Sequence, residues 1–360
     1  MFRPSGVAFI LKWLITAGLP VFVSAHPEQT EKFYSRGLYV LLRNIDLFFL
    51  RFVPFSAGDV LYAAFPLWFF RKILKLETAT RRFRFMEKTL WYIVWIFYLS
   101  WGLNYYRIPY YASEELSPSA LSPSVARKIT VSLIDSVKHY RPHSISDSSS
   151  NIFALKHLRA KAAELYRRQS EKRPALYQPR YVVKPSLFSQ VVSYPGVSGY
   201  FNPFTHEAQI NMLYPEVFRP HVILHELAHQ IGYAREDEAE FLAWQTATEN
   251  SDSLFKYASH LTALQYFLRY WKRRDSVLRK KFYRSLPPEI QNDLRKENEF
   301  IRQYNLPVNL LRPYDYYLKL HQRGKGLESY DELMLYIAAY FQKKNKIAVS
   351  AEEKVYSGGS

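Results

Sequence analysis

The segment VILHELAHQIGYAREDEAEFLAW, residues 222–244, decides how we interpret the chain. His225 and His229 are four residues apart, so on a helix they share one face and their imidazoles can meet at one divalent ion. Glu226 follows the first histidine, where its carboxylate can take a proton from a metal-bound water. Apolar neighbours surround all three residues, which predicts a helix that is buried except where it faces a cleft.

A catalytic zinc site needs a third protein ligand, and the acidic segment after Gly232 can supply it. Gly232 lets the chain turn, and a second helix then begins with the sequence EDEAE, residues 236–240. We favour Glu236 as the ligand and keep Glu238 as the alternative. Glu240, and Glu238 if it is not the ligand, would then orient a ligating histidine. Acids are also favoured in any first helical turn, so some of them can be plain helix-start residues.

The chain has no cysteine, so only histidine and carboxylate remain as strong ligands, a donor set that suits one Zn²⁺ ion. His221 lies on the same helix face one turn earlier. Three ligands along one straight helix cannot converge tetrahedrally, so we expect His221 to pack or to support a ligand.

A hydrolytic site also needs a donor for the developing oxyanion. Tyr330 is our first candidate, and Tyr233 and Arg235 follow it. The segment Ser198–Asn211, just before the metal helix, either forms an ordinary hairpin or offers an edge strand to an extended peptide. In the second case Tyr200 and Asn202, both within this segment, are candidate substrate contacts.

The first 107 residues differ from the rest and predict a membrane module with about three transmembrane helices, near 7–23, 56–76 and 89–106. The first stretch is either a retained anchor, which we favour, or a secretory signal peptide cleaved after Ala25. Residues 34–53 mix arginine with apolar residues and predict an amphipathic helix at the outer interface.

The loop between the second and third stretches, residues 71–88, carries seven basic and two acidic residues. Such a loop belongs on the cytoplasmic side. We therefore expect an integral protein of the inner (cytoplasmic) membrane with its amino terminus inside. Residues 108–356 would form an extracytoplasmic domain that meets a peptide or protein substrate, and 357–360 a flexible tail.

This second part predicts a mostly helical (α+β) domain. A short sheet is expected within 181–211, where Val and Tyr are interrupted by Pro195-Gly196 and Gly199. The predicted helices cover about 124–139, 152–169, 220–231, 236–248, 254–274, 289–303 and 330–343.

The motif H-E-x-x-H followed by E-x-x-A-acid resembles the gluzincin metallopeptidases, in which two histidines and a downstream glutamate bind zinc and the motif glutamate is the general base. The whole chain more closely resembles an uncharacterised family of bacterial membrane proteins that has three amino-terminal spans and a zincin-like domain. Its pattern has Asn where this chain has Glu240. The segments that carry the resemblance are 54–59, 101–107, 199–208, 225–242 and 329–330.

Two other classes compete with a zinc peptidase. One is a non-catalytic membrane protein whose zincin-like domain binds a partner. The other is a nucleic-acid binder, suggested by the net charge of +17 and by residues 269–284, which carry eight basic residues and one acid. That stretch can equally be a solvated helix face or an anionic-lipid contact, and an exported domain seldom meets DNA, so no nucleic acid is expected.

Overall fold

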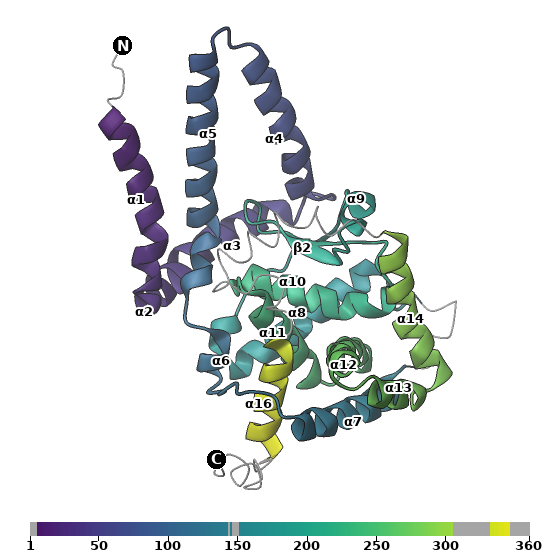
Figure 1. Cartoon of the computed structure of the whole chain (residues 1–360). Coiled ribbons are helices and arrows are strands. Elements are labelled where there is room, and N and C mark those ends of the chain that lie inside the picture. Colours follow the sequence, from purple (N-terminus) through teal and green to yellow (C-terminus); the bar gives the residue numbers. More distant parts are fainter. Residues whose placement is uncertain (1–5, 143–144, 146–150, 305–331, 346–360) are drawn as a thin grey trace.

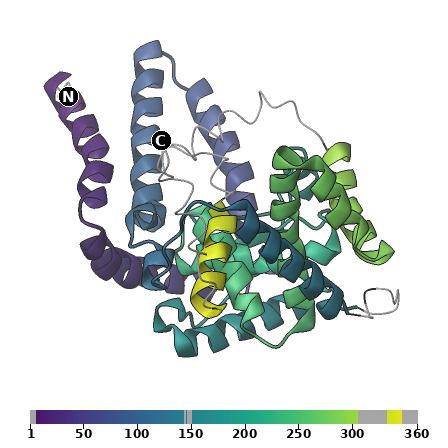
Figure 2. The same ribbon diagram turned by 60° about the horizontal axis from the view of Figure 1, so that its bottom comes forward.

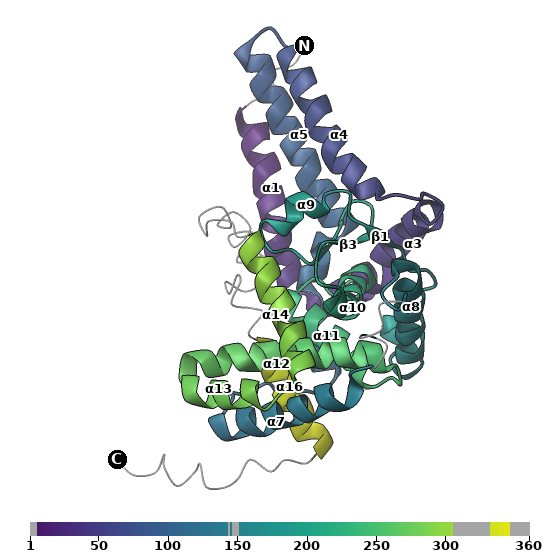
Figure 3. The ribbon, with the colours of Figure 1, turned by 90° about the vertical axis from the view of Figure 1, so that its right-hand side faces the viewer.

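The computed structural model describes residues 6–142, 145, 151–304 and 332–345, and most of them are helical (Figure 1). Three long helices extend from one side of a helical domain (Figure 1). They stand apart from this domain in the other two views as well (Figures 2 and 3). The elements up to residue 113, with η marking 3₁₀ and π turns, are α1 (Gly6–Ser24), α2 (Pro27–Gln29), η1 (Thr30–Leu38), α3 (Tyr39–Leu50), α4 (Ala57–Leu74), α5 (Ala79–Ser100), η2 (Gly102–Tyr106) and α6 (Tyr110–Ser113).

The prediction of several membrane-spanning helices needs correction. Within the described residues, α1 is the one helix long and apolar enough to cross a membrane by length and composition. Helix α5 carries five charged residues in its first half, and α4 has Arg71 and Lys72 in its last turn. The expected third stretch, 89–106, also divides at Ser100, because Trp101 and the residues after it leave the helix and are buried against the domain.

Helix α1 is attached to α5 by polar side chains. Glu87 of α5 accepts hydrogen bonds from Lys12 Nζ at 2.6 Å and from Trp13 Nε1 at 2.8 Å. One turn further on, Thr16 Oγ1 accepts from the indole N–H groups of Trp91 and Trp95, each at 3.0 Å. The two helices therefore run side by side, and the start of α1 lies at the same end as the loop between α4 and α5 (Figure 1).

Helix α3, within the expected interfacial segment, covers the domain with one face. Tyr39, Arg43 and Leu47 are buried on that face, whereas Leu41 and Phe49 on the other side are exposed. The arginine that interrupts this apolar stretch thus has a partner in the domain, described below, and does not face a membrane surface.

The start of α4 and the end of α5 contact the sheet region, at or next to segments that carried the family resemblance. Glu207 Oε2 accepts from the backbone N–H of Gly58 at 2.7 Å, and Asp59 accepts from the hydroxyl of Tyr200. His206 contacts the carbonyl of Ser100 through Nε2 at 3.0 Å. These contacts join the amino-terminal helices to the strands beside the metal helix.

The domain contains the short three-stranded sheet that was predicted, in the order β1-β3-β2. Strand β3 (Ala208–Ile210) pairs in parallel with β1 (Val183–Pro185) and antiparallel with β2 (Gly199–Phe201). Val191 and Val192 were expected to be extended but belong to a short helix, α9 (Ser189–Ser193). The sheet is therefore smaller than the β-favouring composition indicated.

The other helices lie close to the predicted ranges, and α13 is an addition. It begins after Asp275, whose side chain caps the helix by accepting from the N–H of Leu278 at 2.9 Å. The elements are α7 (Pro123–Tyr140), α8 (Leu155–Lys172), η4 (Pro174–Leu176), η5 (Glu216–Phe218), α10 (Arg219–Ile231), α11 (Glu236–Thr248), α12 (Ser253–Arg274), α13 (Ser276–Arg284), α14 (Pro288–Gln303) and α16 (Leu333–Asn345).

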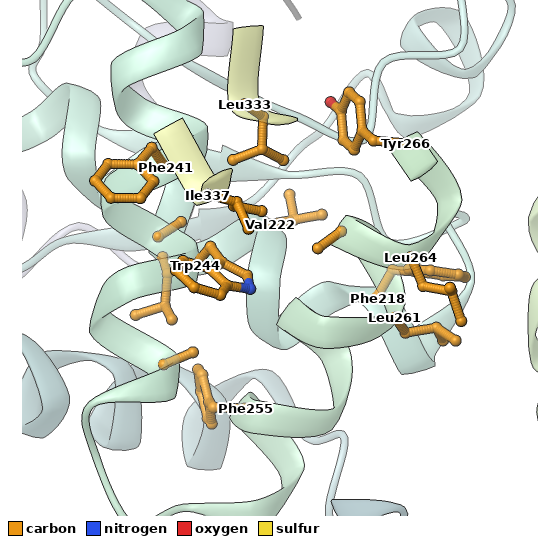
Figure 4. Close-up of a cluster of buried hydrophobic side chains, with 14 of the residues drawn as sticks. Phe218, Val222, Phe241, Trp244, Phe255, Leu261, Leu264, Tyr266, Leu333 and Ile337 are labelled. Atoms are coloured by element: carbon orange, nitrogen blue, oxygen red, sulfur yellow. The ribbon is translucent and has the colours of Figure 1, made fainter. Parts of the chain in front are cut away.

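The core forms where α10, α11, α12 and α16 meet (Figure 4). Trp244 of α11 is almost completely buried and stacks with Phe241 at 5.9 Å between ring centres. Leu333 and Ile337 of α16 pack into the same cluster. Truncating one such aromatic side chain costs about 3–5 kcal/mol, so this cluster gives α10 and α11 a rigid base.

Candidate metal centre

The two helices of the site are joined by a tight turn at Gly232. This residue ends α10 with φ of +113°, a left-handed conformation that favours glycine. A side chain there would also meet the ring of Tyr39, because an added Cβ lies 2.9 Å from that ring. Four residues later α11 begins at Glu236, so its first turn packs against the last turns of α10.

His225, His229 and Glu236 form one group whose ligand atoms all lie within 4.8 Å of one another. The two histidine Nε2 atoms are 3.1 Å apart. Glu236 Oε2 lies 3.1 Å from Nε2 of His225 and 3.5 Å from that of His229. Two imidazoles and one carboxylate that converge in this way can hold a divalent metal ion.

The far nitrogen of each histidine is also engaged. His225 Nδ1 contacts Glu240 Oε2 at 2.7 Å, and His229 Nδ1 contacts the carbonyl of Tyr233 at 2.7 Å. Each contact fixes the ring and, in the neutral imidazole that binds a metal, favours the proton on Nδ1. Nε2 of both histidines is then left as a lone pair directed at the shared point. Glu240 Oε1 also lies 3.1 Å from His221 Nε2, so His221 helps to hold the carboxylate that contacts His225.

The charges of the group favour a cation at its centre. Burial alone would raise the pKa of Glu236, but the nearby His229 and a hydrogen bond with His225 lower it below its ordinary value. Burial would likewise raise the pKa of Glu240, which His221 lowers. Burial would lower the pKa of His225, which its contacts with Glu236 and Glu240 raise well above the usual value. Two ionised carboxylates therefore flank the imidazoles.

Glu226 lies beside this group and is chemically different from the other acids. Burial, opposed by the two histidines, raises the pKa of its carboxyl to about 7. Its Oε2 has no hydrogen-bond partner among the described residues. Gly199 of β2 passes close to it, since a Cβ added there would lie 2.9 Å from Glu226 Oε1. A buried, unpartnered carboxyl with a pKa near neutrality is suited to proton transfer.

The remaining acids of α11 face elsewhere. Asp237 accepts from Arg235 Nη2 at 2.7 Å, and Arg235 Nε lies 3.3 Å from Glu238 Oε1. Burial, with Asp237 beside it, raises the pKa of Glu238 to about 8. The structure thus places Glu238, the alternative ligand, beside arginine and away from the metal group.

A cleft of about 850 Å³ opens over the group. His225, Glu226, His229 and Glu236 lie on one wall. The residues that complete the lining include Tyr62, Phe97, Trp101, Gly199, Tyr200, Phe201, Phe204, Tyr266, Arg269 and Glu297. The cleft is thus lined by the metal group, by strand β2, by α12, by the first half of α4 and by the end of α5.

Several sequence-predicted site residues have other contacts. Tyr233 packs against the guanidinium of Arg107, 4.1 Å from its ring centre, and is absent from the described cleft lining, as is Arg235. The ring of Tyr200 lines the cleft, but its hydroxyl pairs with Asp59 and Ser186. Asn202 is buried and caps a turn by accepting from the N–H groups of Phe204 and Thr205. Tyr330 lies outside the described residues.

The carboxyl end of α10 is held by four residues from the amino-terminal part of the chain. None of them was predicted from the sequence to have a role in the site. The last four carbonyls of a helix lack partners within it. Tyr39 donates to the carbonyl of Gln230 at 2.8 Å, and Trp101 Nε1 donates to that of His229 at 3.2 Å. Arg43 donates to the carbonyl of Ile231 at 3.2 Å, and Arg107 to that of Gly232 at 3.0 Å. The two cations also suit the negative end of the helix dipole.

Arg107 is held in turn by Glu31. Its Nε and Nη2 donate to the two oxygens of Glu31 at 2.8 and 2.7 Å, and both side chains are buried. The only sequence signal for Trp101 and Arg107 was the resemblance, because residues 101–107 are one of its segments. That signal marked the segment but gave its side chains no role. Tyr39, Arg43 and Glu31 lie outside all of its segments.

Comparison with known proteins identifies the family and leaves its chemistry open. The chain belongs to the family described as "Protein of unknown function (DUF3810)", whose model matches residues 34–338. No curated protein and no solved structure matches the chain. The family therefore includes α3, the hairpin of α4 and α5, and the whole metal group.

Proposed function

We propose that this member of the family is a membrane-anchored, zinc-dependent metallopeptidase with a zincin-like domain. The observation that carries the proposal is the buried His225, His229 and Glu236 group, with the unpartnered carboxyl of Glu226 beside it on the same cleft wall. Neutral imidazoles and one carboxylate favour zinc over harder ions, and the three leave one tetrahedral position open.

In this proposal Glu226 is the general base. A zinc ion held by the three ligands would lower the pKa of a bound water towards about 7. Glu226, whose pKa is also raised to about 7, would take a proton from the attacking water and return it to the leaving amine. Glu240 and His221 would keep His225 in its ligating orientation.

Strand β2 offers a place for the substrate backbone. Ser198 and Asn202 pair with the β3 side, through Asn211 N–H and the Glu207 carbonyl. Alternation along an antiparallel strand then directs the backbone groups of Gly199 and Phe201 to the free edge. Both residues line the cleft, so an extended peptide can add to this edge across the metal group.

We propose a tyrosine hydroxyl as the oxyanion donor, with two candidates. Tyr330 stays our prediction from the sequence. Within the described residues, Tyr266 of α12 lines the cleft, and its phenol lies close enough to Glu240 for that carboxylate to help raise its pKa. Replacing each tyrosine by phenylalanine distinguishes them, because loss of an oxyanion donor lowers kcat by about 100- to 1,000-fold.

The membrane part of the proposal starts from α1. Its contacts with α5 through Lys12 and Thr16 favour a retained anchor over a cleaved signal peptide. If α1 crosses the bilayer, these contacts place Glu87 to Trp95 of α5 at the same depth. Neither α4 nor α5 is apolar enough to cross a bilayer by itself. We propose that the two helices enter the bilayer only alongside α1, with the Lys12–Glu87 pair neutralising charge there.

The orientation follows from the ends of these helices. The basic residues at the loop between α4 and α5 are exposed and lie at the same end as the start of α1. Positive loops stay in the cytoplasm, which places the metal domain outside the inner (cytoplasmic) membrane. The basic stretch 269–284 lies with α13 at the opposite end of the molecule from the hairpin (Figures 1 and 3), so it does not face this membrane.

The direct test compares wild type with Glu226→Gln, both as full-length protein loaded with zinc. We expect the variant to bind zinc as wild type does and to lose hydrolysis of a mixed-sequence peptide library. Glu238→Gln is the matched control, because it changes a buried acid of similar size outside the cleft wall. Equal hydrolysis by wild type and Glu226→Gln would reject the assignment. Zinc binding without hydrolysis by wild type would favour the alternative, a non-catalytic binding module.

A further inference from the structure

One end of the cleft lies beside the hairpin helices α4 and α5, near the start of α4 and the end of α5. Tyr62 of α4 and Phe97 of α5 line the same cleft as the metal group. Phe204 lines the cleft with them, and its ring centre is 6.4 Å from that of Tyr62. One end of the cleft is therefore aromatic and belongs to helices that we place in the bilayer.

The metal group lies close to that end. Ser100 is the last residue of α5 and donates to the carbonyl of Pro203 at 2.8 Å. Trp101, one residue further on, packs its ring 6.0 Å from that of His229 and donates to the His229 carbonyl. Thus the residue that follows the helix directly touches a residue of the metal group.

The length of α5 sets the level of the bilayer surface. Its 22 residues span about 33 Å, close to the thickness of about 30 Å of a hydrocarbon core, but five charged residues occupy its first half and only the part from Thr89 to Ser100 is uncharged. If the basic loop before Ala79 lies at the cytoplasmic face, Ser100 lies at the outer face. Exposed apolar side chains along the hairpin, among them Leu67, Phe70, Leu90 and Ile96, agree with lipid on its surface.

The other end of the cleft combines charged and polar side chains with aromatic ones. Arg269 and Gln265 of α12 lie there with Glu297 of α14, whose carboxylate accepts from the hydroxyl of Tyr214 at 2.5 Å. From the hairpin helices to α12 and α14, the lining thus gains charged side chains, although Tyr214, Phe218 and Tyr266 keep it partly aromatic. A polypeptide that leaves a bilayer changes in the same order, from aromatic residues at the interface to charged residues beyond it.

We propose that the substrate is a polypeptide anchored in the same membrane, and that its juxtamembrane segment enters the cleft from the aromatic end. This inference rests on the proposed function and narrows its substrate class. Because the metal group lies next to Trp101, the cut falls near the bilayer, within about ten residues of the anchor, roughly 33 Å of extended chain.

The first experiment tests where the cleft lies. The chain has no cysteine, so Phe204→Cys, and Leu99→Cys as a second variant, can each carry a single bimane label. The full-length protein is placed in phosphatidylethanolamine–phosphatidylglycerol vesicles that contain a headgroup nitroxide lipid. Val277→Cys on α13 is the control, because it is 76% exposed at the opposite end of the molecule. We expect at least threefold stronger quenching at Phe204, which lines the cleft, and at Leu99, at the end of α5, than at Val277. Equal quenching at the three positions would overturn the inference.

The second experiment tests the substrate class. The probe is a single transmembrane helix followed by 40 residues of a repeating flexible sequence, in the same vesicles, and cut sites are mapped by mass spectrometry. We expect cuts within about ten residues of the bilayer, and their distance from the anchor stays the same when the repeat is lengthened. Cuts spread evenly along the repeat would overturn the inference and leave the peptidase intact. If wild type cuts neither this probe nor the free repeat, the proposed peptidase fails, and quenching alone decides the placement of the cleft.

Discussion

Helix α10 is held by two regions of very different origin. On one side α11 follows after a short turn, and Glu236 and Glu240 reach the histidines from 11 and 15 residues along the chain. At its carboxyl end, Tyr39, Arg43, Trp101 and Arg107 donate to its last carbonyls from 125 to 191 residues away. The first region supplies one ligand, Glu236, and a partner for His225, Glu240, whereas the second supplies only backbone support. The groups that bind the metal thus come from one short stretch of the chain, whereas the groups that hold the helix in place come from distant parts of it.

The largest effect is expected where the local region supplies a ligand. Glu236→Gln removes the one charged ligand, so we expect zinc affinity to fall by more than about 100-fold, beyond the usual loss for a supporting residue. Glu238→Gln should leave affinity within about threefold of wild type, because its side chain lies beside Arg235. Competition with a chromophoric chelator measures both. Equal losses would mean that the first turn of α11 is arranged differently.

The distant region should act mainly through stability. Arg107→Met leaves Glu31 buried without its main partner, which costs about 3–5 kcal/mol of unfolding free energy. The double variant Arg107→Met, Glu31→Gln should recover part of that loss, because it removes the stranded charge. Chemical denaturation in detergent micelles gives these values. No recovery in the double variant would show that the Gly232 contact of Arg107 carries the effect.

Glu240 should behave as a supporting residue. We expect Glu240→Gln to lower zinc affinity by about 10- to 100-fold, while one ion per chain still binds at saturation. The resemblance family has asparagine at this position, so Glu240→Asn should retain more affinity than Glu240→Ala. Chelator competition on the three variants gives the order, and an alanine variant as tight as wild type would contradict the role of Glu240.

The smallest effect is expected at a single donor of the distant region. Tyr39→Phe removes one hydrogen bond to the Gln230 carbonyl and should cost about 0.5–1.5 kcal/mol of stability, with zinc affinity changed less than in Glu240→Gln. Tyr177→Phe, at a tyrosine that is 62% exposed, serves as the control. A larger loss of zinc affinity in Tyr39→Phe than in Glu240→Gln would reverse the comparison between the two regions.

The same comparison explains what the sequence could predict. Helical spacing relates His225 to His229, and a glycine turn followed by acids brings Glu236 to them, so the group follows from periodicity over 12 residues. Tyr233 and Arg235 are as close in sequence, but their side chains leave the turn on the other side, towards Arg107 and Asp237. Periodicity within a helix does not determine side-chain direction in a turn.

The distant contacts depend on tertiary structure and have no local signal. Arg43 looked like an arginine of an amphipathic interfacial helix, and Arg107 like a charge after a membrane span; only the fold brings them to the end of α10. For the same reason Trp101 was assigned to a membrane span, although it is 5% exposed against the domain. Composition identified apolar segments correctly but could not show which of them faces lipid and which faces protein.

The central claim is that His225, His229 and Glu236 hold one zinc ion. Its most direct test is the metal content of full-length protein purified from membranes without added metal, measured by mass spectrometry of the elements. The account predicts one zinc per chain in wild type and in Glu226→Gln, and none in His229→Ala. A zinc-free wild type, or the same zinc content in all three proteins, would contradict it.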